Sequence, residues 1–366
     1  MGLYLSIAFF LLFGLCAELA TKRKRAAITL ENSTLPRENK RTRLQILFFI
    51  GVMLVLWFLT AYRSANMGND TKNYIMYFNV FGNFGISTDS RIEIGYQILN
   101  IVVSKISKDP YFFLGVVATI CYIGTGVYIF KYADNIVFST ILVFPVVYSF
   151  FASGLRQAIA MVICLYAYQA IKNKKLVLAF ILIAFASSFH TTAWLLLLLL
   201  VHKFIPKRPF FVVSLFGIFV ALSLTGIMDN IFTVLLGNYG GYYEKEGMTD
   251  GWLGITYYCL RNLVFYILVY LSYRGNVKKN SLALSTFSLL LITVAFGFSL
   301  NLFSRATNYF LLISIVELPN AIHRGKLQNK RLLTFLVIFV MVLYFLVTLI
   351  IRPEWNNLYP YEFYWN

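Results

Sequence analysis

The chain has few charged residues, which excludes most soluble classes of protein. Charged residues make up 13% of its 366 positions, whereas they make up about 25% of an ordinary soluble domain. Hydrophobic residues reach 59%, and the mean hydropathy is +0.72. The sequence therefore predicts an all-α, polytopic integral membrane protein in which residues 1–366 form a single membrane domain.

Acidic residues are especially scarce, at 15 Asp and Glu against 32 Lys and Arg, for a formal net charge of +17. In a soluble chain this excess would suggest nucleic acid as a partner. Here the basic residues gather in short connectors between apolar segments, as the positive-inside rule predicts for cytoplasmic loops. We therefore expect the lipid bilayer as the partner of this chain and no nucleic acid.

Several chemical motifs are also missing. The four cysteines, Cys16, Cys121, Cys164 and Cys259, all lie in apolar segments without metal-ligand spacing and behave as small hydrophobic residues. The chain has no Gly-rich phosphate loop, no HExxH or GxSxG motif, no carboxylate-rich cluster and no visible internal repeat. We expect no metal, no cofactor and no disulfide framework.

Long apolar segments are abundant and predict about twelve membrane crossings with both termini on the exterior side. Leu3–Ala20 is better interpreted as a first membrane helix than as a signal peptide, because the basic cluster follows it. Residues 21–43 form a basic cytoplasmic loop, 63–110 an exterior loop and 228–254 a second exterior loop. Within the first exterior loop, Ile92–Ser107 is too short to cross and predicts a short exterior helix near Glu93.

The apolar run from Leu176 to Val201 has basic connectors on both sides, so both of its ends are expected in the cytoplasm. Such a run has to turn around. Ser187–Thr192, which contains His190, supplies the polar groups that a broken helix needs at membrane depth. We therefore expect a re-entrant or broken helix pair near His190; the alternative is one tilted helix with His190 in its core.

Arg156 is the most informative polar residue, because it opens an apolar helix. An arginine in such a helix costs about 2.5 to 3.5 kcal/mol on insertion scales, so it normally has a partner or a ligand. The alternative is that Arg156 extends to lipid headgroups. The topology places several further polar residues in the same exterior half: Asp70, Tyr74, Glu93, Gln157, His190 and Arg305. Because arginine offers a planar fork of donors to phosphate oxygens, this group suits a phosphate-bearing, lipid-linked substrate.

Six short motifs follow one another in the chain: GNDTKNYIMYF, EIGYQIL, GLRQAIA, SSFHTTA, FSRATNYF and PYEF. Their order and spacing resemble the EpsG-like branch of the Wzy-type bacterial polysaccharide polymerases, which make O-antigen, capsule and exopolysaccharide. The resemblance implies a metal-independent glycosyltransferase in the bacterial cytoplasmic membrane, with its active site on the exterior side. It would join oligosaccharide repeat units carried on undecaprenyl diphosphate by transferring the growing chain to a sugar hydroxyl. Flippase and chain-length regulator proteins are the partners it implies.

Within this resemblance, the candidate catalytic residues are Glu93, His190, Arg156 and Arg305. The arginines would neutralise the diphosphate leaving group, and Glu93 or His190 would act as the base for the acceptor hydroxyl. The candidate substrate-binding residues are Asp70, Tyr74, Tyr96, Gln157 and Tyr309.

Three other functions remain open at this point. A transporter or flippase for an anionic lipid would also use arginines inside the membrane. An O-antigen ligase-like transferase has nearly the same chemistry as a polymerase. A membrane O-acyltransferase would also place a histidine in an apolar run.

Overall fold

Helices account for nearly all of the regular structure in the computed structural model, which describes residues 1–31, 41–88, 91–228, 251–298 and 305–365. Among these residues there is no β-strand, only one isolated bridge between Arg63 and Phe363. The predicted all-α class is confirmed. The chain forms two units, residues 1–162, 188–190 and 328–366 in the first and residues 163–187 and 191–327 in the second.

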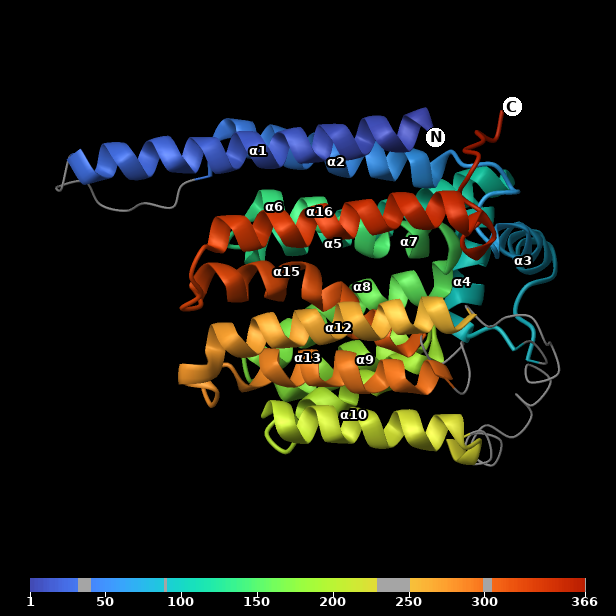
Figure 1. Cartoon of the computed structure of the whole chain (residues 1–366). Helices are drawn as coiled ribbons and strands as arrows, with labels where there is room; N and C mark the ends of the chain where they lie inside the picture. Colours follow the sequence, from blue (N-terminus) through green and yellow to red (C-terminus); the bar gives the residue numbers. More distant parts are fainter. Residues whose placement is uncertain (32–40, 89–90, 229–250, 299–304, 366) are drawn as a thin grey trace. The chain divides into compact units, whose positions relative to one another are not determined.

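The first unit is built on long apolar helices that lie along one direction in Figure 1. They are α1 (Gly2–Glu31), α2 (Arg43–Ala61), α5 (Pro110–Tyr132) and α16 (Lys330–Ile351), and the shorter α6 (Ile136–Val143) packs against them. Side chains cap the starts of two of them: Thr42 and Gln45 form a reciprocal capping box on α2, and the Asp109 carboxylate accepts a hydrogen bond from the backbone N–H of Tyr111 on α5.

The basic segment predicted as a loop over residues 21–43 is partly helical, because α1 continues to Glu31. The sequence from Thr21 to Glu31 contains neither glycine nor proline, so nothing in it stops a helix. Residues 32–40 of the predicted loop lie outside the described residues.

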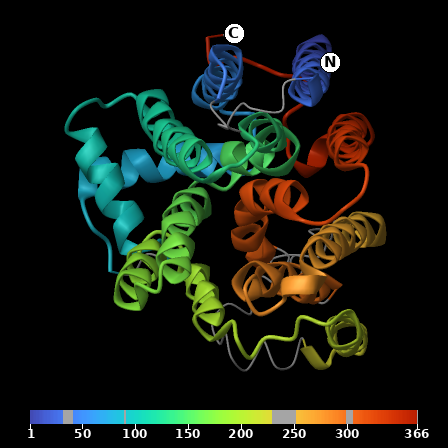
Figure 2. The ribbon, with the colours of Figure 1, turned by 90° about the vertical axis from the view of Figure 1, so that its left-hand side faces the viewer.

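Two short helices run across the long ones at the end of the first unit where both termini lie (Figures 1 and 2). The helix α4 (Ile94–Ser104) is the short helix predicted near Glu93. The helix α3 (Thr71–Phe84) differs from the sequence prediction, which favours a loop for this polar, turn-rich stretch. Its buried residues Tyr74, Phe78 and Phe81 are spaced at i, i+4 and i+7, which is the pattern of an amphipathic helix.

After helix α6, the backbone becomes irregular. A π-helical turn, η1 (Phe144–Tyr148), contains Pro145 and is followed by α7 (Ser149–Ser153). Proline has no backbone N–H and cannot form the i→i−4 hydrogen bond of an α-helix, so a π-helical turn replaces the regular helix here. Gly154 then separates α7 from α8 (Leu155–Lys172), of which residues 155–162 belong to the first unit.

The second unit contains α9 (Leu176–Ser187), the 3-10 helix η2 (Thr191–Val201), α10 (Pro209–Leu224), α12 (Gly251–Tyr273), α13 (Ser281–Val294) and α15 (Asn308–Arg324), with the short turns η4 (Arg274–Asn276), η5 (Ala295–Phe298) and η6 (Arg305–Thr307). Helices α9 and η2 pack against each other. The rings of Phe180 and Trp194 lie 6.0 Å apart, so the chain reverses direction between them. The broken pair predicted near His190 is confirmed, and a single tilted helix is excluded.

Seven described helices are long and apolar enough to cross a membrane: those at Gly2–Ala20, Arg43–Ala61, Pro110–Tyr132, Ile136–Ser153, Gly254–Asn276, Ser281–Phe298 and Lys330–Ile351. The chain is therefore a polytopic membrane protein. Four shorter apolar helices, α4, α9, η2 and α10, accompany them. The total of about twelve crossings stays a prediction. The second exterior loop, predicted at 228–254, lies largely outside the described residues, and its last four residues belong to α12.

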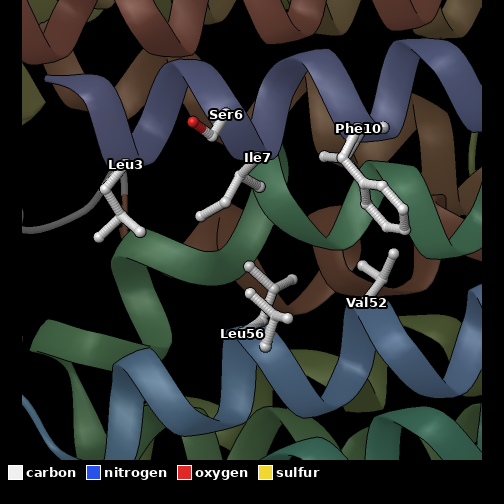
Figure 3. Close-up of a pocket in the computed structure, with 8 residues that line it drawn as sticks. Leu3, Ser6, Ile7, Phe10, Val52 and Leu56 are labelled. Atoms are coloured by element: carbon white, nitrogen blue, oxygen red, sulfur yellow. The ribbon is translucent and has the colours of Figure 1, made fainter.

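A groove of about 200 Å³ lies between α1 and α2 in the first unit. Figure 3 shows Leu3, Ile7 and Phe10 of α1 facing Val52 and Leu56 of α2 across it. Its lining is apolar apart from the Ser6 hydroxyl. Such a groove offers no group for bond-breaking chemistry, so the candidate site lies elsewhere in the unit.

Candidate functional site

Glu93 and Arg156 form an ion pair in the first unit, although 63 positions separate them in the chain. Glu93 is the N-cap residue of α4, but its carboxylate does not cap that helix. Instead it accepts a hydrogen bond from Nη1 of Arg156, the second residue of α8. The two side chains keep 15% and 22% of their surface exposed. The sequence predicts only that these two residues share the exterior half; the structure brings them into direct contact, and both side chains keep some exposed surface.

Gly95 brings the His190 segment next to the Glu93 segment. Its N–H donates to the carbonyl of Ser188 with an N to O distance of 2.7 Å. A Cβ at position 95 would lie 2.4 Å from the Ser188 Oγ, so only glycine allows this approach. His190 is half-buried two residues further on, in the break between α9 and η2. The break thus lies beside the start of α4, as the predicted site requires.

Tyr74 and Tyr96 pack together beside the ion pair. Their ring centroids lie 5.8 Å apart in an edge-to-face arrangement. Tyr74 is 5% exposed and Tyr96 is fully buried, and both lie close enough to Arg156 to interact with its charge. Burial raises the pKa of Tyr96 well above its ordinary value, so its phenol stays protonated at neutral pH. These rings form an aromatic wall next to the guanidinium.

Asp70 and Gln157 are the other predicted binding residues of this unit. Asp70 precedes α3, which carries Tyr74, and Gln157 lies in α8 with Arg156. Asp70 is half-exposed at the start of α3, and its carboxylate does not cap that helix. Gln157 follows Arg156 and is 3% exposed. Gly68 orients the turn before Asp70: its φ is +76°, and its N–H donates to the Asn357 carbonyl at 2.9 Å.

Arg305 and Tyr309 belong to the second unit. Arg305 is exposed in η6, and Tyr309 is 1% exposed in α15. The Tyr309 hydroxyl shares a hydrogen bond with the Thr192 hydroxyl at 3.0 Å, so the segment just after His190 is tied to α15 within this unit. That Arg305 acts together with Arg156 stays a prediction.

Arg63 is a buried cation that the sequence analysis did not single out. It is 1% exposed, and its guanidinium donates to the Thr60 carbonyl and, at 3.2 Å, to the Thr71 hydroxyl. Nη2 is buried without a hydrogen-bond partner among the described residues, and no described carboxylate pairs with it. Four tyrosines lie close enough to interact with its charge: Tyr74, Tyr122, Tyr148 and Tyr361.

Burial lowers the pKa of Arg63 to about 10, so it still carries its charge at pH 7. Because Tyr74 interacts with both Arg63 and Arg156, two cations lie around one tyrosine. One signal in the sequence could have identified Arg63: an arginine directly after a span that leads outward goes against the positive-inside rule.

The C-terminal tail holds the segment that carries Arg63. The Ser64 N–H donates to the Glu362 carbonyl at 2.9 Å, and the Glu362 carboxylate accepts from the Ser64 and Asn66 side chains at 3.2 and 3.3 Å. The Tyr361 hydroxyl donates to the Leu59 carbonyl at 2.7 Å. The late PYEF motif therefore has a structural role beside the candidate site.

The arrangement suits the binding of an anion and proton transfer. Arg156 presents a fork of donors, and its Nε is buried without a hydrogen-bond partner in the described part of the chain. Glu93 is a carboxylate that could accept a proton if a ligand took its place on Arg156. Over the described residues, no group of three or more His, Cys, Asp or Glu side chains is placed to hold a metal ion.

A family model described as the EpsG family matches residues 46–363 of the chain. The match includes every candidate residue described above, from Arg63 to Glu362, and it confirms the resemblance inferred from the six motifs. No curated protein and no solved structure matches the chain.

Proposed function

Because the chain belongs to the EpsG family, a family of polysaccharide polymerase-like glycosyltransferases, we propose that it joins lipid-linked oligosaccharide repeat units into a surface polysaccharide. The substrate is an oligosaccharide on undecaprenyl diphosphate, and the reaction takes place at the outer face of the bacterial cytoplasmic membrane. The observation that carries this proposal is the ion pair between Glu93 and Arg156 at the edge of a tyrosine-lined site.

In the proposed mechanism, Arg156 exchanges its Glu93 partner for the substrate. The diphosphate of the growing chain replaces the Glu93 carboxylate on the guanidinium, because a phosphate accepts both arms of the fork. Arg63 adds a second fixed positive charge beside Tyr74, and Arg305 a further cation. These charges stabilise the negative charge that develops on the leaving diphosphate.

The released Glu93, or alternatively His190, then accepts the proton of the acceptor sugar hydroxyl. The acceptor oxygen forms a bond to the anomeric carbon of the growing chain, and the bond from that carbon to the diphosphate oxygen breaks. The products are a chain lengthened by one unit and free undecaprenyl diphosphate. Asp70, Tyr74, Tyr96, Gln157 and Tyr309 position the sugars. Flippase and chain-length regulator proteins are the partners that would deliver units and set the length.

The test is complementation of a deletion strain with Arg156→Lys and Arg305→Lys, followed by analysis of the lipid-linked oligosaccharides. Lysine keeps the charge but loses the fork, so we expect polymerisation to fall by about 10²- to 10³-fold. Single repeat units on the lipid should accumulate without a ladder of longer chains. Arg352→Lys is the matched control, because Arg352 pairs with Glu354 on the surface at 3.6 Å.

Three results would reject the proposal. Normal ladders in both lysine variants would make these arginines interfacial anchors. If the deletion strain has no repeat units at the outer face, the protein moves units rather than joins them, which is the transporter or flippase function. Normal ladders that fail to reach their final acceptor would instead indicate a ligase-like transferase.

A further inference from the structure

Arg261 stands inside an apolar helix of the second unit without an acidic partner. It lies in α12, seven positions after the start of the candidate span Gly254–Asn276, which corresponds to about 10 Å along the helix. No described carboxylate forms an ion pair with it. By contrast, the buried Glu317 of this unit has a cationic partner, because it accepts a hydrogen bond from Lys172 at 2.5 Å. An arginine inside an apolar helix normally has a partner or a ligand, and no carboxylate of the described residues serves Arg261 as that partner.

The structure fixes the orientation of the Arg261 side chain. Its Nε donates to the Asn262 Oδ1 at 3.0 Å, and the fully buried Asn262 donates in turn to the Leu290 carbonyl of α13 at 2.9 Å. The guanidinium also lies over two rings, 5.8 Å from Tyr257 and 5.1 Å from Tyr258. Helical side chains lean towards the N-terminus of their helix, which explains the contacts at i−4 and i−3.

The terminal nitrogens of Arg261 are left for a ligand from the bilayer. Among the described contacts, only Nε of Arg261 forms a hydrogen bond, and the residue as a whole is partly exposed. The neighbouring Leu260 and Val264 expose 59% and 42% of their surface, so this face of α12 is open to lipid. A fixed, planar fork on a lipid-facing surface suits the phosphate group of a lipid.

We propose that Arg261, Tyr257 and Tyr258 form a binding site for a lipid phosphate. The phosphate accepts hydrogen bonds from the two terminal nitrogens of Arg261, and the tyrosine rings hold the guanidinium plane. The ligand is either the diphosphate of a lipid-linked substrate, in which case the site serves the proposed polymerase, or the headgroup of an anionic phospholipid. The site itself does not depend on the polymerase activity.

The experiment measures equilibrium binding to the full-length protein in maltoside micelles, which contain no phosphate. The probes are farnesyl diphosphate, phosphatidylglycerol and farnesol, which lacks the phosphate. We expect Arg261→Lys and Arg261→Gln to weaken binding of at least one phosphate-bearing probe about 10- to 100-fold. Farnesol binding should not change. Tyr258→Phe keeps the ring and should retain affinity, whereas Tyr258→Leu should lose part of it.

Arg274→Gln is the matched control, because Arg274 is exposed in η4 at the other end of the same helix. A loss confined to farnesyl diphosphate assigns the site to the lipid-linked substrate, and a loss that includes phosphatidylglycerol assigns it to a phospholipid. Unchanged affinity for both probes in both Arg261 variants overturns the proposal. A defect in polymerisation plays no part in this readout, so failure of the proposed function and failure of this site can be told apart.

Discussion

At the scale of single residues, two arginines described in the first unit differ in their partners: the half-buried Arg156 has a counter-charge, and the buried Arg63 has none among the described residues. Arg156 has the Glu93 carboxylate, whereas Arg63 has only a carbonyl, a hydroxyl and surrounding tyrosines among its described contacts. Burying a charge without a counter-charge costs several kcal/mol even after the protein relaxes. Such a residue stabilises the fold only if its hydrogen bonds offset this cost. If they do not, its presence points to a functional role. Substitutions can separate these two roles.

Glu93→Gln and His190→Gln separate acid-base chemistry from packing. Glutamine roughly keeps the volume and the hydrogen-bonding capacity of both side chains, so the amount of folded protein should stay close to that of the natural protein. Loss of the base should lower turnover by about 10²- to 10⁴-fold. The measurement is the rate of polymerisation in membranes, normalised to the amount of protein.

The two variants also identify the base. A loss in one variant alone assigns the role to that residue. If both variants lose folded protein in proportion to activity, then Glu93 and His190 support the start of α4 and the helix break, and the proposed chemistry is wrong for both.

Arg63→Met tests whether the unpaired charge of Arg63 serves function. Methionine removes a buried charge and fills a similar volume, so the melting temperature in detergent should stay equal or rise. Polymerisation should fall, because one of the two cations around Tyr74 is lost. Burial lowers the pKa of Arg63 from its ordinary value to about 10, so the cost of its charge is fully present below pH 10 and is relieved only as the pH rises through that value. Measurements at pH 7 therefore compare a charged with a neutral side chain.

A purely structural Arg63 would behave differently in this test. Its hydrogen bonds to Thr60 and Thr71 would then dominate, and Arg63→Met would lower the melting temperature and the activity together. Arg352→Met provides the comparison, since Arg352 is exposed and both quantities should remain unchanged.

At the scale of secondary-structure elements, the sequence predicts the long helices and the break better than the connectors. Apolar runs of about twenty residues and paired basic flanks are strong signals because both follow directly from the bilayer. Helix α3 is missed because its polar residues, such as Lys72 and Asn73, hide the period of Tyr74, Phe78 and Phe81. For Glu93 and Arg156 the sequence indicates only a shared side of the membrane, since no local pattern encodes a contact over 63 positions.

Gly95→Ala tests the contact between α4 and the His190 break. The new Cβ would lie 2.4 Å from the Ser188 Oγ and 2.8 Å from its carbonyl oxygen, so one of the two segments has to move. Such overpacking costs about 1 to 3 kcal/mol. We expect a lower melting temperature and a loss of activity, with partial recovery in the double variant Gly95→Ala/Ser188→Gly, which removes the nearer clash.

Gly115→Ala is the matched control for this substitution. Gly115 lies in α5, and a Cβ added there would have no other atom within 4 Å among the described residues. Alanine in a helix is favoured over glycine by about 1 kcal/mol, so that variant should be neutral or slightly stabilised. If Gly95→Ala behaves in the same way, then α4 and the break are not held in the close contact described here.

At the scale of the whole chain, contacts in the first unit place several exterior-predicted segments at one end. The Tyr4 hydroxyl donates to the Leu358 carbonyl at 2.7 Å, which joins the start of α1 to the tail. The rings of Tyr111 and Tyr364 stack at 4.6 Å, which joins the start of α5 to the tail. At the opposite end of α5, Arg41 donates to the carbonyls of Phe130 and Ala133. Arg41 belongs to the basic segment that precedes α2. It thus lies at the end of this unit opposite the tail, as the positive-inside rule requires.

This arrangement makes the sidedness of the site testable with single cysteines in a background without the four natural ones. Asn83→Cys in α3 and Glu354→Cys in the tail should react with a membrane-impermeant thiol reagent in intact cells, because both positions are exposed at the end that carries the candidate site. Lys175→Cys, exposed in the basic connector between α8 and α9, should react only after the membrane is opened. Labelling of Lys175→Cys alone would reverse the orientation. Glu93 and Arg156 would then face the cytoplasm, where the polymerase proposed here could not meet repeat units at the outer face.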